Sequence, residues 1–393
     1  MQKKLIAIAV AGALGAPAVA LAQTSTVNIY GTITYEYGIA DQGNGRPKVD
    51  YADSPGGSAI GFRGEEKLGG GLSAWFQCES SADVRAMDQT GFCTRNSAVG
   101  FKGAFGNLHF GRWDTPFKRA MNQGTVGAEE TGLLGMSFVA FGGSGGADAT
   151  GTGPDSQGRQ RFKRREAGLT YYESPNFGGF QVLGAFSSGN AASDNAALDQ
   201  SANKKPRIWS LGGTYNNGPI AIGAGYEKHK QFGAFSLLGL PPAADLDDKG
   251  WGISAAYTFA GKVKVGGTYL DRNWQTAPGR NLKKKTWTIG VDWAIAGPHS
   301  VQAQFAKAGD SKGNSLVAIN EAGGGGAASG PDTGAKDYEI AYSYAFSKRT
   351  RVKFGYHKTD NDNNAAYKLG NVAGLLTRGD SQSAWAFHIQ HRF

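Results

Sequence analysis

The chain has 393 residues, of which 40% are hydrophobic and 61 are glycine, and its formal net charge is +9. Beyond the N-terminal leader, no stretch approaches the roughly 18 consecutive apolar residues that a membrane-spanning helix needs, which excludes helical membrane proteins. The positive charge is spread thinly along the chain, so we take it only as a hint of ion preference.

The first 22 residues have the features of an export signal. A basic start at Met1–Lys4 precedes an apolar run from Leu5 to Val19, and Ala20-Leu21-Ala22 forms an A-x-A cleavage site. A membrane-spanning helix is the alternative, but the apolar run is short for it. We expect residues 1–22 to be a signal peptide and residues 23–393 to form the folded domain. Export also makes nucleic acid an unsuitable partner.

From Val27 onward, apolar residues recur at every second position, which indicates β-strands with one apolar and one polar face. The last strand carries Trp385, Phe387, Ile389 and Phe393 on its apolar face and ends on an aromatic carboxylate. We expect Phe393 to be needed for assembly. The expected strands cover residues 26–39, 58–66, 72–81, 95–102, 108–113, 164–174, 180–189, 206–215, 220–229, 250–259, 263–273, 285–295, 300–308, 336–346, 350–359 and 381–393.

Short and long connections alternate between these strands. Seven tight turns, such as the one around Lys348, alternate with eight longer segments rich in Gly, Asn and Asp, as in outer-membrane barrels. The faces opposite the apolar ones are polar (Thr286, Thr288 and Asp292 are examples), and such a wall cannot enclose a dry core. A barrel of sixteen strands is too wide for side chains to fill. The pattern therefore predicts an all-β, 16-stranded antiparallel transmembrane barrel around an aqueous channel.

The chain has two cysteines, Cys78 and Cys93, which flank the polar segment 79–92. Oxidising compartments favour pairing of cysteines in exported proteins. If the segment is a hairpin loop, its flanking strands bring the two together, and we expect a disulfide. Two free thiols, one of them facing lipid, is the alternative.

The third long connection stands out by its length. After Pro116, no convincing strand appears until about Arg164, and about fifty residues of a stable barrel cannot all be mobile. We expect part of this connection to fold into the lumen and narrow the channel. This connection contains the acidic residues Asp114, Glu129 and Glu130, followed by a basic cluster at residues 159–165.

Arginines are expected on the opposite side of that narrowing. Arg63 shares inward parity with Gly61, and Arg95 begins the next ascending strand. Arg164 is expected to face inward together with Glu166, Gly168 and Thr170, with Leu169 and Tyr171 facing outward. The predicted constriction sets Asp114, Glu129 and Glu130 against Arg63, Arg95 and Arg164.

Such an arrangement creates a transverse field that orients dipolar solutes and selects ions by charge. Arginine suits the role because its guanidinium stays charged and presents fixed donors. Ordinary solvated surface charge is the alternative for each of these residues.

Signals for catalysis, metal or cofactor binding are weak. Residues 142–146 fit the hydrolase pattern G-x-S-x-G, but they lie in a Gly-rich loop rather than between a strand and a helix. The six histidines are scattered without the spacing of metal ligands, and no nucleotide-binding fingerprint occurs. We expect neither an enzyme nor a cofactor or metal.

Six stretches carry a family resemblance: VNIYG at 27–31, GFRGEEKLGGGL at 61–72, GNLHFGR at 106–112, YYESPNFGGF at 171–180, YAFSKRT at 344–350 and HRF at 391–393. Together they resemble the general diffusion porins of Gram-negative bacteria, in the betaproteobacterial branch. The resemblance implies an outer-membrane barrel surrounded by lipid and lipopolysaccharide, which trimerises and folds its third loop inward. It also implies passive diffusion of small hydrophilic solutes and ions.

In anion-preferring members of that family, wall arginines form a basic cluster facing the third loop. Arg95 and Arg164 match two of those positions, whereas Ala59 stands where a third is often arginine. This departure and the loop carboxylates argue against strong anion selectivity.

Other functions remain open from the sequence. A substrate-specific channel for an anion or sugar needs an aromatic ladder or a basic staircase, and the lumen-facing Lys264, Arg351 and Lys353 are candidates whose alignment the sequence does not reveal. An outer-membrane enzyme needs a catalytic constellation at a rim, and a secreted β-rich adhesin is the remaining alternative.

Overall fold

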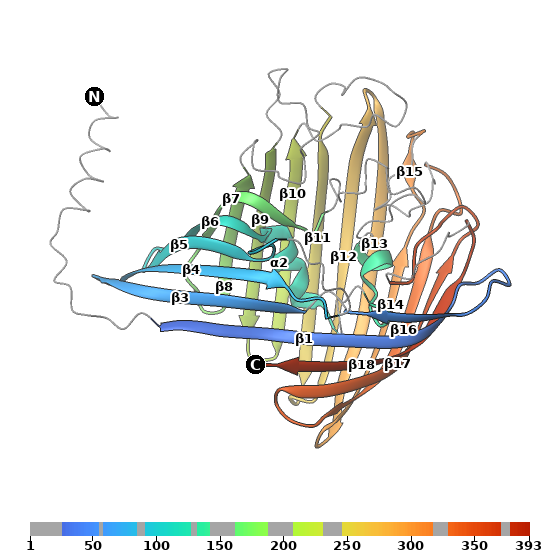
Figure 1. Ribbon diagram of the computed structural model, residues 1–393. Helices are drawn as coiled ribbons and strands as arrows, with labels where there is room; N and C mark the ends of the chain where they lie inside the picture. Colours follow the sequence, from blue (N-terminus) through green and yellow to red (C-terminus); the bar gives the residue numbers. More distant parts are fainter. Residues whose placement is uncertain are drawn as a thin grey trace.

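A computed structural model describes residues 26–54, 58–84, 91–126, 132–141, 162–187, 207–230, 246–316, 329–370 and 378–393; the expected signal peptide lies outside them. The wall consists of sixteen antiparallel strands, which confirms the predicted number (Figure 1). They are β1 (Thr26–Asp41), β3 (Ala59–Gly69), β4 (Leu72–Ser81), β5 (Ser97–Gly103), β6 (Gly106–Asp114), β7 (Arg165–Glu173), β8 (Phe180–Ser187), β9 (Arg207–Asn217), β10 (Ile220–Lys230), β11 (Asp248–Phe259), β12 (Val263–Ala277), β13 (Arg280–Ala296), β14 (His299–Ala308), β16 (Ala335–Ala345), β17 (Thr350–Asn361) and β18 (Gln382–Arg392). Two short strands, β2 (Val49–Asp53) and β15 (Lys312–Gly313), add to its rim.

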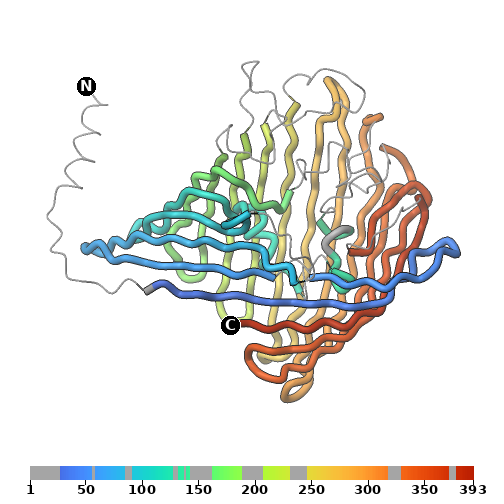
Figure 2. Tube along the Cα trace, viewed as in Figure 1, coloured from blue at the N-terminus to red at the C-terminus, as the bar shows by residue number. Residues whose placement is uncertain are grey.

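The sheet closes on itself. Each long strand pairs with its neighbours in the chain, and the first strand, β1, pairs with the last, β18, for example through Tyr35 and Ile389. Figure 2 follows the chain from blue β1 around the wall to red β18, which lies beside it. Closure pairs the backbone groups of both terminal strands, as a wall surrounded by lipid requires.

The two faces of the wall differ as the alternation predicted. On β11, Trp251, Ile253 and Tyr257 are exposed on the outer surface, while Ser254 and Gly252 between them are buried on the inner side. Large apolar side chains are thus exposed outside and polar ones gather inside. This is the inverse of a soluble protein and suits a wall in contact with lipid.

The predicted parity of β7 is wrong beyond Gly168. Leu169 and Tyr171, expected to face outward, are buried on the inner side, and Tyr172 is exposed. Gly168 has a φ of 58°, and the pairing of β7 with β6 shifts register between Gly111 and Trp113. Such an irregularity adds a residue to one strand and reverses the faces beyond it.

One predicted long connection is in fact a tight turn. Strands β12 and β13 run on to Ala277 and Arg280, and Gly279 turns the chain with a φ of 70°. The polar residues between 274 and 284, which indicated a loop, belong to a hairpin longer than its neighbours. Lys283 and Lys285 are therefore strand residues.

The connection between β6 and β7 contributes helices α2 (Pro116–Met121), η1 (Asn122–Gly124) and α3 (Ser137–Phe141). Thr115 accepts a hydrogen bond from the Lys118 N–H at the start of α2, where a proline at the first position is well tolerated. No helix among the described residues is long and apolar enough to cross a membrane.

Helix α2 packs on the inward-facing residues of β9, β10 and β11. The Phe117 N–H donates to Ser210 Oγ at 3.0 Å, and Ser254 Oγ donates to the Ala120 carbonyl at 2.7 Å. Helix α3 contacts β13, β14 and β16, where Thr286 donates to the Ala140 carbonyl at 2.7 Å. The described helices of this connection are thus bound to the polar face of the wall.

Candidate functional site

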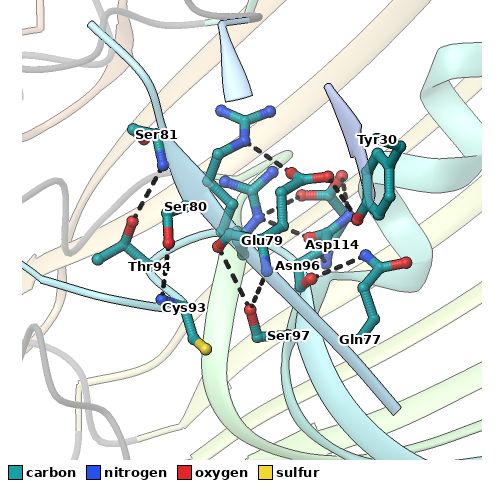
Figure 3. Close-up of polar contacts among 12 residues, drawn as sticks. Tyr30, Gln77, Glu79, Ser80, Ser81, Cys93, Thr94, Asn96, Ser97 and Asp114 are labelled. Carbon is teal, nitrogen blue, oxygen red and sulfur yellow. Dashed lines mark hydrogen bonds and ion pairs between the residues drawn. The ribbon is translucent and has the colours of Figure 1, made fainter. Parts of the chain in front are cut away.

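Charged side chains gather on the inner wall where β4, β5, β6 and β7 adjoin the start of α2 (Figure 3). Glu79 on β4 accepts hydrogen bonds at both carboxylate oxygens. Tyr30 Oη donates to Oε2 at 3.1 Å, and Arg95 Nε donates to Oε1 at 2.7 Å. The Arg95 N–H also donates to the Glu79 carbonyl, so backbone and side chain together fix this arginine.

A second carboxylate, Asp114, ends β6. Lys118 Nζ lies 2.9 Å from it and Arg165 Nε lies 3.2 Å from it. Asn96 links the two sides, because its Nδ2 donates to Asp114 and its Oδ1 accepts from Arg165 Nε at 2.6 Å. We call Glu79, Arg95, Asn96, Asp114 and Arg165 the charged wall cluster.

The structure brings three of the predicted constriction residues to this part of the wall. Arg95 and Asp114 belong to the cluster, and Arg63 is exposed on β3 with its guanidinium 5.1 Å from the centre of the Tyr30 ring. Arg164 is only 4% exposed and forms an ion pair with Glu166. Arg165, the next residue, joins the cluster instead.

We expected loop carboxylates to face wall arginines across the channel, and the structure shows this arrangement only in part. Asp114 is bonded directly to its basic neighbours rather than facing them across open space. Glu129 and Glu130 lie outside the described residues.

Glu79, Lys118 and Arg165 were not among the predicted constriction residues. Glu79 shares inward parity with Trp75 and Gln77, and that signal was available in the alternation. Lys118 follows Asp114 by four residues, the spacing that joins side chains along a helical turn. Nothing local distinguishes Arg165 from Arg164.

A disulfide joins Cys78 and Cys93, whose Cα atoms are 4.8 Å apart. The Cys93 N–H also donates to Ser80 Oγ at 2.9 Å. The bond closes the second long connection just before Arg95, and thereby restrains the chain that carries this arginine.

Arg119 attaches α2 to the wall by an ion pair with Glu173 on β7. Burial acts to lower the pKa of Arg119, but Tyr171 and Glu173 outweigh it and hold that pKa above its ordinary value. The guanidinium is therefore charged at every physiological pH.

Four rings form an aromatic cluster beside these charges: Trp75, His109, Trp113 and Tyr171. His109 stacks on Tyr171 with ring centroids 4.6 Å apart, and Trp75 and Trp113 meet edge to face at 5.8 Å. His109 and Tyr171 are fully buried. The rings pack on one another and do not form an open ladder along the wall.

The lumen-facing lysines likewise form no open staircase. Lys264 Nζ donates to the Thr125 carbonyl at 3.0 Å, and Lys353 is only 2% exposed. Lys264 thus holds the third connection to the wall, and Lys353 is shielded from the lumen. Neither feature expected of a substrate-specific channel is present among these residues.

On β1 and β17, two wall residues hold the backbone at 133–134. Glu36 accepts hydrogen bonds from the Leu133 and Leu134 N–H groups, the latter at 3.3 Å. His357 Nδ1 donates to the Leu133 carbonyl at 2.7 Å, and its Nε2 lies 2.9 Å from Asp337. Neither Glu36 nor His357 was singled out from the sequence. Within the described ranges, no group of three or more potential ligands could hold a metal ion.

The amino-acid sequence is similar to those of known proteins. A family model described as Gram-negative porin matches residues 7–364. Outer membrane porin protein 32 of Delftia acidovorans is 28% identical over 406 aligned residues that cover all of both chains.

Two solved structures share the fold. One is an anion-selective porin from Comamonas acidovorans, with a TM-score of 0.73 at 22% identity, covering 94% of this chain and all of the other. The other is OmpT of Vibrio cholerae in trimer form, with a TM-score of 0.60 at 16% identity, covering 94% of this chain and all of the other.

Proposed function

The chain belongs to the Gram-negative porin family, and we propose that its charged wall cluster sets the ion preference of the channel. The protein is an outer-membrane porin, and its barrel forms a channel. Members of the family are channels rather than enzymes, and we propose that this chain has no catalytic activity.

The channel passes small hydrophilic solutes and ions by passive diffusion. The observation that carries this proposal is the polar inner face of a closed sixteen-stranded wall. We further propose that the third connection and the charged wall cluster together form the constriction. The contacts of α2 and α3 with the wall support this role, since they hold these helices against the polar inner face of the barrel.

We expect a modest preference for anions. Arg63, Arg95, Lys118 and Arg165 contribute four positive charges in and beside the cluster, against two negative charges of Glu79 and Asp114. A water-filled pore with this excess concentrates anions. A channel specific for one anion is the second candidate, which the same excess favours, but Lys264 is hydrogen-bonded to the Thr125 carbonyl and Lys353 is buried.

We expect export, oligomeric state and lipid environment to be those of related porins. We propose that residues 1–22 are removed on export, that the barrel assembles as a homotrimer, and that lipid and lipopolysaccharide surround it. The trimer form of OmpT, a structure with the same fold, supports the oligomeric part of this proposal.

Single-channel recording of the purified protein in a planar bilayer tests the proposal, with the reversal potential measured across a KCl gradient. We expect ohmic steps and a reversal potential of the sign for anion preference. Arg95→Gln is expected to lower the anion-to-cation permeability ratio by about two- to fivefold, since a unit charge at contact distance in water is worth up to about 1 kcal/mol.

Glu79→Gln is expected to raise the same ratio, and Lys262→Gln, in a tight turn away from the cluster, to leave it unchanged. Absence of conductance from verified, folded protein contradicts the channel. Equal ratios for Arg95→Gln and Lys262→Gln contradict the role of the cluster.

A further inference from the structure

The disulfide between Cys78 and Cys93 lies on the outer side of the wall. On β4, Cys78 shares the outward parity of the exposed Phe76, and the register sets it opposite Phe62 of β3. The ring of Phe92, next to Cys93, is 74% exposed and lies 6.4 Å from the ring of Phe62. The second long connection therefore returns to the barrel along the outer side of β4.

Within two residues of Cys93, the chain has crossed to the inner side of the wall. Cys93 has a φ of 58°, and Arg95 already points inward, where its guanidinium lies 2.7 Å from Glu79. A φ of this sign is uncommon for a residue with a side chain and turns the chain sharply. The disulfide and the ion pair thus hold the same few residues from opposite faces of β4.

Regular strand pairing does not hold Arg95 in place. The ladder between β4 and β5 ends at Gln77 and Ala98, so Arg95 lies beyond it. Residues 93–95 are attached to β4 by single hydrogen bonds, of which Figure 3 shows the contacts of Cys93 and Thr94: the Arg95 N–H donates to the Glu79 carbonyl at 2.8 Å, the Cys93 N–H to Ser80 Oγ at 2.9 Å, and the Ser81 N–H to Thr94 Oγ1 at 3.4 Å. The covalent bond two residues away is therefore the strongest restraint on the backbone of Arg95.

We propose that the disulfide between Cys78 and Cys93 is a redox-sensitive determinant of the ion preference of the channel, which acts by positioning Arg95. This inference rests on the proposed function, because it assumes that the charged wall cluster sets that preference. In the intact protein, Arg95 offsets the charge of Glu79 at the inner wall. When the disulfide is opened, residues 93–95 are free to leave β4 and Glu79 loses its counter-charge, so the channel admits cations more readily.

Opening the bond requires an external dithiol as the reductant. One of its thiolates attacks a sulfur of the disulfide, forms a mixed disulfide and displaces the other cysteine as a thiolate. The second thiol of the reductant then attacks the mixed disulfide, releases the remaining cysteine and closes the oxidised reductant into a ring. Two electrons and two protons thereby pass to the protein, which ends with two thiols. Cys93 is partly exposed and its neighbours Gly91 and Phe92 are exposed, so a dissolved dithiol reaches the bond.

The proposal is tested by recording the folded protein in a planar bilayer before and after treatment with dithiothreitol, with the reversal potential measured across a KCl gradient. We expect reduction to lower the anion-to-cation permeability ratio by about 1.5- to twofold, less than Arg95→Gln does, because the charge is displaced rather than removed. Reoxidation is expected to restore the ratio. Alkylation followed by mass spectrometry measures the reduced fraction, and heat-modifiable gel migration establishes that the barrel is folded.

Two variants distinguish positioning of Arg95 from other effects of the reductant. Cys78→Ser/Cys93→Ser is expected to have the lowered ratio from the outset and no response to dithiothreitol. Because the disulfide lies on the outer side of the wall, this substitution alters no group at the inner wall. In Arg95→Gln, the ratio is expected to be the same before and after reduction, since the arginine that the disulfide positions is absent.

A wild-type ratio in either the fully reduced protein or the double cysteine variant overturns the proposal, as does a disulfide that dithiothreitol leaves intact in the folded barrel. A response to reduction that persists in Arg95→Gln also contradicts it, because the bond then acts by another route. If Arg95→Gln lowers the ratio but loss of the disulfide does not, only the disulfide proposal is wrong. If Arg95→Gln itself has the wild-type ratio, the role of the charged wall cluster and this inference are both wrong.

Discussion

At the scale of single residues, buried polar groups on the inner wall hold the third connection in place. Glu36 is fully buried and accepts hydrogen bonds from the two backbone N–H groups of Leu133 and Leu134. A buried donor that loses its acceptor costs about 1–3 kcal/mol. The position of residues 133–134 therefore depends on this carboxylate together with His357, which donates to the Leu133 carbonyl.

Glu36→Gln replaces one of the two acceptor oxygens by a donor, so one of the Leu133 and Leu134 N–H groups loses its acceptor. We expect this segment to be held about 1–3 kcal/mol less tightly. Hydrogen exchange of the two amides is expected to become faster, and the open-channel current noisier. Glu65→Gln, at an exposed pair with Lys102, is the control and is expected to change neither. Unaltered exchange in Glu36→Gln contradicts the assigned role.

At the scale of elements, glycines in the wall let α2 approach the strands closely. A Cβ on Gly223 would collide with the Ala120 carbonyl of α2, and one on Gly225 would approach the Phe117 Cα to 3.1 Å. The helix backbone therefore rests directly on β10. This close approach leaves more of the lumen open than a wall of larger residues would.

Gly223→Ala is expected to push α2 from the wall toward the channel axis and so to reduce single-channel conductance. The collision involves backbone atoms, which cannot move aside as a flexible side chain does. We expect a destabilisation of about 1–3 kcal/mol, typical of overpacking. Gly184→Ala on β8, where an added Cβ has no neighbour within 4 Å, is the control. If the two variants conduct equally, α2 does not limit the channel.

At the scale of the whole molecule, stability depends on closure between the first and last strands. The Gly31 N–H donates to the Phe393 carbonyl at 3.2 Å, and the Phe393 N–H donates to the Gly31 carbonyl at 3.1 Å. The last residue thus completes the pairing of β1 with β18, and its ring occupies the space above Gly31. In lipid, backbone groups left unpaired are far more costly than in water.

Deletion of Phe393 is expected to remove both terminal hydrogen bonds and to reduce the yield of folded barrel to a small fraction of the wild type. The shift in gel migration between unheated and heated samples measures the folded fraction. Phe346→Ala, which removes an exposed ring at the end of β16, is the control and is expected to fold normally. Wild-type amounts of folded barrel in the deletion variant refute the role of the C-terminal residue.

Most of the wall could be predicted from local patterns. Alternation with period two identifies strands and their faces without reference to distant residues, so the sixteen strands and the apolar outer surface were accessible from the sequence. The prediction of which β7 side chains face the lumen failed, because one irregularity at Gly168 reverses the orientation of every side chain beyond it. The prediction of a long loop at 274–284 failed because polar residues are compatible with an extended hairpin as well as with a loop.

The sequence by itself determined the class of fold, because each strand reports its own periodicity. The tertiary structure alone decided which charges meet: that Arg165 rather than Arg164 joins Asp114, and that Glu79 fixes Arg95. These contacts depend on strand register and on segments far apart in the chain. A periodic pattern contains no information about either, since it describes the orientation of a side chain but not its neighbour.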